Sequence, residues 1–153
     1  MKGKYDISIW DNKIRFELVL ERQITVIKGK SGTGKSTLFM MFEDMLNKGR
    51  VTGIHCNCKD KIRVLSLSDD FKTIISNEHD KIFVFDEYFD YIQTQEFAEA
   101  VNNSDNYFIF ITRSGRMNWL TYSVNNIYEL RTERDGLKFV TRLYAKYTIQ
   151  NGR

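Results

Sequence analysis

One nine-residue segment constrains the fold of this chain more than any other. Residues 29–37 read G-K-S-G-T-G-K-S-T and fill every fixed position of the phosphate-binding loop pattern G-x-x-x-x-G-K-[ST]. The pattern is informative only between a strand and a helix, and both are predicted here. Residues 23–28 are a short β-branched run, and residues 35–48 lack Gly and Pro and carry apolar residues at helical spacing. We therefore expect a strand–loop–helix unit that binds phosphate.

The loop offers the groups that a phosphate needs. Its glycines let the backbone curl with N–H groups pointing inward, and the following helix directs its positive end at the same point. Lys35 is expected to bring a cation to the β and γ phosphates, and Ser36 a hydroxyl to Mg²⁺. Thr37 is expected in the first turn of the helix. The predicted nucleotide-binding residues are Gly29, Ser31, Gly32, Thr33, Gly34, Lys35, Ser36 and Thr37.

A pair of acidic residues follows a second buried strand. Residues 81–88 read K-I-F-V-F-D-E-Y, and an apolar run without alternation is typical of a strand buried on both faces of a parallel sheet. Asp86, at its carboxyl end, is expected to hold Mg²⁺ together with Ser36. Glu87 is expected to polarise the attacking water, a role worth typically ~10² to 10⁴ in rate. The alternative is that the two acids only cap the next helix.

These motifs resemble those of the P-loop NTPases, in the branch with a catalytic glutamate that includes the ABC-type, AAA+ and RecA-like ATPases. Residues 29–36 match Walker A and residues 82–87 match Walker B. The resemblance covers residues 23–130 and implies binding of ATP with Mg²⁺. It is incomplete, because the sequence has no L-S-G-G-Q-like signature between the motifs, no helical lid of the AAA+ kind and no histidine after Walker B. We therefore expect a reduced core rather than a transporter engine.

A third apolar run supplies the remaining polar candidates. Residues 107–111 precede Thr112 and Arg113. The resemblance implies a strand inserted between the two Walker strands that ends in a residue sensing the γ-phosphate, and Thr112 matches that position. Arg113 and Arg116 could also face the phosphates, where an arginine is worth ~10³ to 10⁵ in rate, or could be solvated loop residues. The predicted catalytic residues are Lys35, Glu87, Thr112 and Arg113.

The first 20 residues predict a β-hairpin. Turn-forming residues 11–13 separate two alternating apolar runs. Such an antiparallel entry is similar to the start of an ABC-type nucleotide domain, in which an aromatic side chain stacks on adenine. Tyr5, Trp10 and Phe16 are the candidates for this role, with a position in the core as the alternative for each.

A second hairpin is predicted near the C-terminus. Residues 126–131 and 137–144 flank a turn over residues 132–136 that contains Asp-Gly. Basic residues gather here with Tyr144 and Tyr147 between them, so a basic aromatic strip could contact nucleic acid, with a solvated hairpin face as the alternative. These basic residues are Arg131, Arg134, Lys138, Arg142, Lys146 and Arg153.

Alternation of strands and helices through the middle of the chain predicts an α/β fold. We expect a three-layer P-loop NTPase core with a mainly parallel sheet and β-hairpins at both the N-terminal and C-terminal ends. A length of 153 residues and a hydrophobic content of 42% suit one nucleotide-binding domain over residues 1–153. The net charge of +3 does not by itself demand nucleic acid. No apolar stretch approaches about 18 residues and no signal peptide is recognised, so a cytoplasmic location is predicted.

Two thiols and an imidazole lie within four residues, as His55, Cys56 and Cys58. They could bind zinc, but a tetrahedral site needs a fourth ligand and usually a wider cysteine spacing. His79 is the only other histidine and lies far along the chain. Reduced thiols in a loop after Gly53 are the expectation, with a metal site as the alternative.

Two function classes fit these features. The first is an ATPase that couples Mg²⁺-dependent hydrolysis to the assembly or remodelling of a protein or nucleic-acid partner, with a homo-oligomer possible. The second is a small-molecule or nucleotide kinase that uses the same loop. Such kinases usually begin directly with the P-loop strand and carry an arginine-rich lid, so the hairpin at the start and Glu87 favour the ATPase. A nucleotide-gated module with negligible turnover is a third possibility, and the sequence does not separate ATP from GTP.

Overall fold

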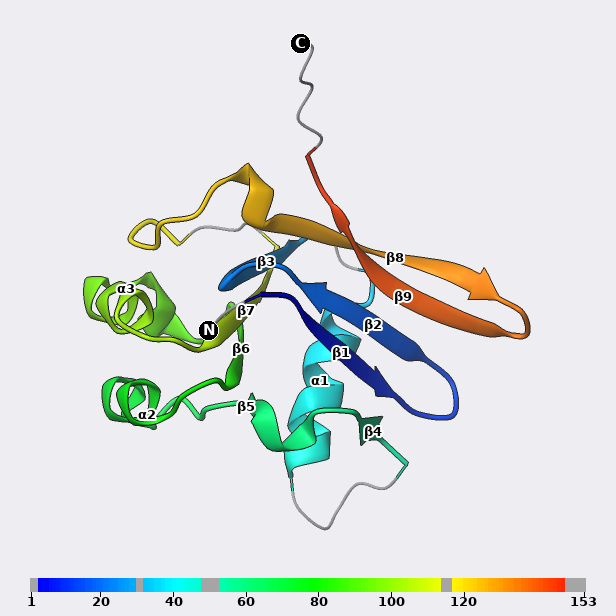
Figure 1. Cartoon of the computed structure of the whole chain (residues 1–153), viewed down its shortest axis with the longest axis horizontal. Coiled ribbons are helices and arrows are strands. Elements are labelled where there is room, and N and C mark those ends of the chain that lie inside the picture. Colours follow the sequence, from blue (N-terminus) through cyan, green and yellow to red (C-terminus); the bar gives the residue numbers. More distant parts are fainter. Residues whose placement is uncertain (1–2, 30–31, 48–52, 114–116, 148–153) are drawn as a thin grey trace.

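The protein folds as one nine-stranded sheet with helices packed against it (Figure 1). The computed structural model describes residues 3–29, 32–47, 53–113 and 117–147. The helices in these ranges are α1 (Lys35–Leu46), α2 (Phe71–Asn77) and α3 (Gln95–Asn102), with 3₁₀ turns η1 (Lys59–Lys61), η2 (Asp90–Gln93) and η3 (Val124–Asn126). The strands are β1 (Tyr5–Trp10), β2 (Arg15–Leu20), β3 (Ile24–Lys28), β4 (His55–Cys56), β5 (Ile62–Arg63), β6 (Ile82–Asp86), β7 (Tyr107–Thr112), β8 (Ile127–Asp135) and β9 (Lys138–Ala145).

Five neighbouring strands of the sheet run in the same direction. The strand order is β4-β1-β2-β9-β8-β3-β7-β6-β5, and β8, β3, β7, β6 and β5 are parallel. Strands β3, β6 and β7 are buried along nearly their whole length, which explains why their sequences show no alternation. Their carboxyl ends meet at one edge, where Lys28 pairs with Thr112, and Asp86 pairs with Ile111.

Helices lie on both sides of these parallel strands. In Figure 1, α1 lies on one side of β6 and β7, and α2 and α3 lie together on the other. The α3 side is packed with aromatic rings: the Phe97 ring is 5.2 Å from Phe85 of β6 and 5.9 Å from Phe110 of β7. On α1, Leu38 and Phe42 are fully buried. The fold is thus a mixed α/β structure whose sheet is covered on both faces in this region.

The other half of the sheet curls toward the start of α1. The predicted N-terminal hairpin is present, with β1 and β2 paired antiparallel from Tyr5↔Leu20 to Trp10↔Arg15. Strand β2 also pairs in parallel with β9, so the two hairpins share one sheet. The Phe16 ring lies 3.7 Å from the position that a Cβ on Gly34 would take. The hairpin therefore packs against the segment that leads into α1.

The C-terminal hairpin is also present, but its predicted turn was placed too early. Residues 132–135 continue β8 instead of turning, and the register runs to Asp135↔Lys138. The two-residue connection is Gly136-Leu137, and Gly136 has φ 69°, a left-handed conformation that favours glycine. Cross-strand contacts explain the extension, because the Thr132 and Thr141 hydroxyl oxygens are 2.7 Å apart in a hydrogen bond.

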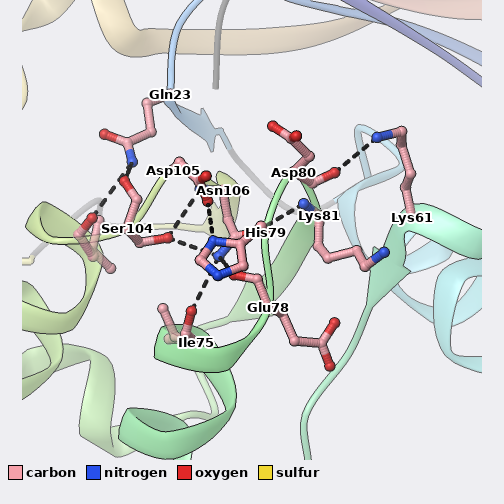
Figure 2. A network of polar contacts seen from close by, with 11 residues as sticks. Gln23, Lys61, Ile75, Glu78, His79, Asp80, Lys81, Ser104, Asp105 and Asn106 are labelled. Atoms are coloured by element: carbon pink, nitrogen blue, oxygen red, sulfur yellow. Dashed lines mark hydrogen bonds and ion pairs between the residues drawn. The ribbon is translucent and has the colours of Figure 1, made fainter.

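A buried amide joins three elements at the opposite edge of the parallel strands (Figure 2). Asn106, which is fully buried, donates from Nδ2 to the carbonyl oxygens of Ile75 at 3.2 Å and Glu78 at 2.9 Å. Its Oδ1 accepts the backbone N–H of Lys81 at 2.8 Å. The end of α2 is thereby tied to the starts of β6 and β7.

A second amide adds β3 to this junction. The Gln23 Nε2 donates to the Ser104 carbonyl at 2.7 Å (Figure 2). The Phe108 N–H donates to the Gln23 carbonyl at 2.8 Å. The amino ends of β3, β6 and β7 are therefore held in a fixed relation. The same bonds fix where the three carboxyl ends lie.

Replacing Asn106 by alanine should lower the free energy of unfolding by about 3 kcal/mol, because it leaves a buried N–H and two carbonyl groups without their amide partner. Asn103→Ala is the matched control: this exposed asparagine should change stability by less than about 0.5 kcal/mol. Urea unfolding measures both. Equal losses in the two variants would contradict the role assigned to Asn106.

Candidate functional site

A cavity of about 240 Å³ lies at the carboxyl ends of β6 and β7. The start of α1 and the ends of these two strands line it, because β7 lies between β3 and β6 in the sheet. Candidate residues that are far apart in the sequence thus share one site. The predicted site residues that line the cavity are Lys35, Ser36, Asp86, Glu87, Thr112 and Arg113.

The phosphate-loop segment adopts conformations that glycine allows. Gly32 has φ 89° and Gly34 has φ 100°, both in the left-handed region. Helix α1 begins directly after Gly34, whose carbonyl accepts the Leu38 N–H at 2.9 Å. The first N–H groups of α1 therefore lie at the loop, where a helix favours an anion.

The remaining predicted residues of the loop differ in their positions and contacts. Thr37 is exposed in the first turn of α1, as expected. Thr33 accepts a hydrogen bond from Lys35, and Gly29 follows β3 directly. Ser31 lies outside the described residues, as does Arg116.

Lys35 holds a buried positive charge at the cavity. Its side chain is only 7% exposed, and Nζ donates to the Thr33 hydroxyl oxygen at 3.5 Å. Burial lowers the pKa of Lys35 from its ordinary value of 10.5, and the nearby Arg113 charge lowers it further, while Glu87 opposes the shift. A bound polyanion would relieve this repulsion, so the electrostatics fit a phosphate chain.

Asp86 lines the same cavity as Ser36. It lies half-buried at the end of β6, where its Oδ1 accepts the Tyr88 N–H at 2.9 Å. Burial raises the pKa of Asp86 from 3.8, and the Tyr88 hydrogen bond partly offsets this. A carboxylate and a hydroxyl on one cavity wall fit Mg²⁺, which takes one or two carboxylates together with phosphate oxygens.

Glu87 is held by the neighbouring strand. Its Oε1 accepts the Thr112 hydroxyl at 3.1 Å and the Arg113 backbone N–H at 2.9 Å. Neither Asp86 nor Glu87 caps the helical segments that follow, because η2 has no side-chain cap and Thr94 caps α3. The contact between Glu87 and Thr112 was not foreseen, since it depends on the register that pairs β6 with β7.

A larger cavity of about 520 Å³ adjoins the first and shares Ser36, Phe39, Asp86 and Tyr88 with it. Mostly apolar walls with a few polar groups are typical of ligand sites. Burial raises the pKa of Glu43 on its wall, and Asp86 raises it further. No sequence motif predicted this cavity. Part of its wall is a segment after β5 whose sequence has no recognisable pattern. The other residues that line it are Met40, Glu43, Leu65, Ser66, Leu67 and Phe89.

The aromatic candidates for adenine stacking do not line the phosphate-site cavity. Phe16 is fully buried in the core, and Tyr5 packs against Tyr107 with ring centroids 5.9 Å apart. The Trp10 ring stacks on His55 at 5.5 Å and carries the Arg15 guanidinium 4.5 Å from its centroid. A role in stacking on adenine is therefore not supported by their positions.

The charges of the C-terminal hairpin are largely paired. Glu129 accepts from Arg131 at 2.7 Å and lies 3.4 Å from Lys146. Glu133 lies 3.4 Å from Arg142, and the Arg131 guanidinium lies 4.6 Å from the Tyr144 ring centroid. This pairing favours the solvated face over a nucleic-acid strip. Arg153 lies outside the described residues.

The residues considered for zinc are arranged differently from a zinc site. His55 and Cys56 form β4 rather than a loop, and the His55 ring stacks on Trp10. Within the described ranges, no group of three or more His, Cys, Asp or Glu side chains is arranged to hold a metal ion. Cys56 and Cys58 are free thiols.

A comparison with protein-family models places this site in a known context. The model described as nSTAND3, novel STAND NTPase 3, matches residues 13–150. The chain belongs to the nSTAND3 family. Nucleotide binding in general is consistent with membership of this NTPase family, and the matched range includes the loop, both acids and the end of β7. Searches of curated proteins and of solved structures found no match to this nSTAND3 chain.

A helix that crosses a bilayer needs about 20 consecutive, mostly apolar residues. No helix that the structure describes in this nSTAND3 chain has the length and apolar character to cross a membrane.

Binding of ATP should weaken as the pH rises through the lowered pKa of Lys35, below 10.5, with proton uptake on binding in that range. The lowered pKa of Lys35 means that free protein loses this proton below 10.5, whereas a bound triphosphate favours the ammonium. The affinity for ATP is therefore highest at pH values below the lowered pKa of Lys35, and it falls as the pH rises through that pKa. Calorimetry in two buffers of different ionisation enthalpy measures the uptake. Lys72→Ala, at an exposed lysine of α2, should leave the profile unchanged, and a flat profile without proton uptake would refute the assignment.

Proposed function

We propose that this nSTAND3 protein is a Mg²⁺-dependent ATPase of the catalytic-glutamate branch of P-loop NTPases. The observation that carries the proposal is one cavity lined by Lys35, Ser36, Asp86, Glu87 and Thr112. A cation, a hydroxyl, two carboxylates and a polar strand end are the groups that phosphoryl transfer to water requires.

The strand arrangement supports the same proposal. Strand β7 lies between β3, which leads into the loop, and β6, which ends in the two acids. Helices on both faces of these parallel strands support a three-layer P-loop core. We include in the proposal that residues 1–153 form a single nucleotide-binding domain.

The residues divide between binding the nucleotide and binding the metal. The N–H groups of the loop and the first turn of α1 would hold the phosphates, with Lys35 as their cation. Ser36 and Asp86 would hold Mg²⁺ from the same wall of the cavity. When bound, the ion supplies neutralisation of the charge that develops on the phosphate oxygens.

Glu87 is the proposed general base, and its neighbours orient it. The Thr112 hydroxyl and the Arg113 N–H fix Oε1, so the carboxylate is positioned before the water arrives. The other oxygen, Oε2, is the one assigned to take the proton of the water. Thr112 thus acts through Glu87 as well as through any contact with the γ-phosphate.

Nucleotide turnover is proposed to drive the assembly or remodelling of a protein or nucleic-acid partner. Of the described arginines, only Arg113 lines the cavity. In related phosphoryl-transfer chemistry a second chain can supply an arginine to the transition state, worth ~10³ to 10⁵ in rate. A homo-oligomer that shares the site is therefore part of the proposal.

A kinase is the second candidate, and the cavity of about 520 Å³ favours it. This space is large enough for a small molecule and meets the phosphate site at Ser36 and Asp86. A phosphoryl acceptor bound there would lie beside the γ-phosphate. Phosphate release into water supports the ATPase, whereas transfer of radiolabelled phosphate to an acceptor supports the kinase.

Glu87→Gln should keep ATP binding and lose at least about 100-fold in phosphate release, because an amide preserves the shape of the side chain but cannot act as a base. Lys35→Ala should instead abolish binding or weaken it severely while the fold persists. Calorimetry and a phosphate-release assay separate the two effects.

Glu99→Gln, at an exposed glutamate of α3, is the matched control and should behave as the parent. Parental turnover by Glu87→Gln would make Glu87 structural. Unchanged ATP affinity in a folded Lys35→Ala protein would remove the phosphate-loop assignment itself.

ATP should promote self-association of the Glu87→Gln protein, because this variant retains the triphosphate that a second chain would contact. Multi-angle light scattering with ATP and with ADP compares the masses. Identical masses in both states, together with full turnover by the monomeric parent, would mean that Arg113 or another internal residue completes the site.

A further inference from the structure

Two cysteine thiols lie in contact away from the phosphate site. The Sγ atoms of Cys56 and Cys58 are 3.9 Å apart in a hydrogen bond, and both thiols are free. Neither residue lines the two cavities described above. A disulfide requires the sulfurs to approach to about 2.05 Å, so the pair needs a further movement of only about 2 Å to react.

The two thiols differ in access. Cys56 ends β4 and is half-buried, whereas Cys58 is 8% exposed. The hydrogen bond with the Cys58 thiol lowers the pKa of Cys56 to about 7, although burial opposes this shift. The same bond raises the pKa of Cys58. Because the thiolate is the nucleophile in disulfide exchange, Cys56 is the thiol that attacks first.

The residue between the cysteines fixes the pair on the sheet. Asn57 donates its N–H to the Ser8 carbonyl at 3.1 Å and accepts the Ser8 N–H on Oδ1 at 2.9 Å. Its Nδ2 donates to the Asp6 carbonyl at 2.9 Å. These bonds hold the two thiols close together on the edge of β1, so their proximity follows from the backbone arrangement.

The positive charge of Lys61 favours the second thiol as a resolving group. Lys61 acts to lower the pKa of Cys58, and so does the Tyr5 hydroxyl. Their effect is opposed by the hydrogen bond with Cys56, by burial and by the Cys56 anion, all of which raise the pKa of Cys58. The hydrogen bond and the anion are lost once Cys56 is bonded to another sulfur, whereas burial remains. Cys58 is therefore easier to ionise after the first step than before it.

We propose that Cys56 and Cys58 form a thiol–disulfide exchange site for small disulfides of the glutathione class. The Cys56 thiolate attacks one sulfur of the disulfide, breaks its S–S bond and releases one thiolate, leaving a mixed disulfide on Cys56. Cys58 then gives its proton to the released thiolate, attacks the Cys56 sulfur and displaces the second thiolate. The two cysteines are oxidised to one disulfide, and the small disulfide is reduced to one thiol and one thiolate, which takes from solvent the proton that Cys56 released on ionising.

The disulfide between Cys56 and Cys58 closes a small ring that contains only one residue between the two cysteines, Asn57. Hydrogen bonds to β1 fix this segment in place. Strained or exposed disulfides have more oxidising potentials than structural ones. The Cys56–Cys58 bond is therefore reversible by small thiols. Whether this disulfide is formed would depend on the redox state of the cell. The disulfide would lie at the edge strand β4, which pairs with β1 at Ile9↔Cys56.

Incubation of the full chain with oxidised glutathione, followed by acid quench and intact mass spectrometry, tests the proposal. The parent should lose the mass of two hydrogens without retaining glutathione, and dithiothreitol should reverse the loss. Cys58→Ser should stop at the mixed disulfide on Cys56. Cys56→Ser should react roughly tenfold more slowly, because the remaining thiol is buried and less ionised.

Two results would overturn the proposal. One is a parent that stays fully reduced or stops at the mixed disulfide, and the other is a Cys56→Ser protein that reacts as fast as Cys58→Ser. Circular dichroism checks the fold of each variant. If a serine variant does not fold, iodoacetamide labelling of the parent and peptide mapping compare the two thiols directly, and equal labelling would exclude Cys56 as the attacking group.

Discussion

The buried amide of Asn106 is the interaction on which the arrangement of the parallel strands depends. A buried amide is costly unless its donors and acceptor are paired, and here the end of α2 and the start of β6 supply those partners. Strands buried on both faces carry few polar groups that could fix their register, so a satisfied polar group at their amino ends has a large effect. A shift of one residue would move Asp86 and Thr112 by about 3.3 Å relative to each other.

The site at the other edge of the sheet brings like charges together and buries some of them. Without a ligand, the like charges repel one another and their burial costs free energy. Lys35 is buried near Arg113, and Asp86 is half-buried near Glu87. In the proposed function, a magnesium nucleotide would bring the complementary charge to each group, with phosphates for the cations and the metal for the acid. The nSTAND3 family match agrees with nucleotide binding in general, and the proposed reaction rests on how Glu87 is held by β7.

The features predicted correctly from residue pattern alone were local ones, whereas the position of β7 between β3 and β6 was implied by the family resemblance. The strand before the loop, the helix after it and the apolar strands that end at Asp86 and Thr112 follow from residue pattern and spacing. The contact from Thr112 to Glu87 and the larger cavity depend on strand register and on packing between distant segments, which no short pattern encodes. The turn of the C-terminal hairpin was misplaced because polar residues 132–135 resemble a loop, although cross-strand pairs keep them in β8.

The parallel pairing of β2 with β9 determines when the sheet can be completed during folding. Arg15 pairs with Val140, so β2 finds this neighbour only after the chain has been synthesised as far as β9. Contacts between residues so far apart in sequence slow folding, because the intervening chain must be closed first. Until then β2 has an open edge beside apolar residues such as Phe16, which is a template for pairing with other chains. We therefore expect slow folding, with aggregation of the incomplete chain as its main competitor.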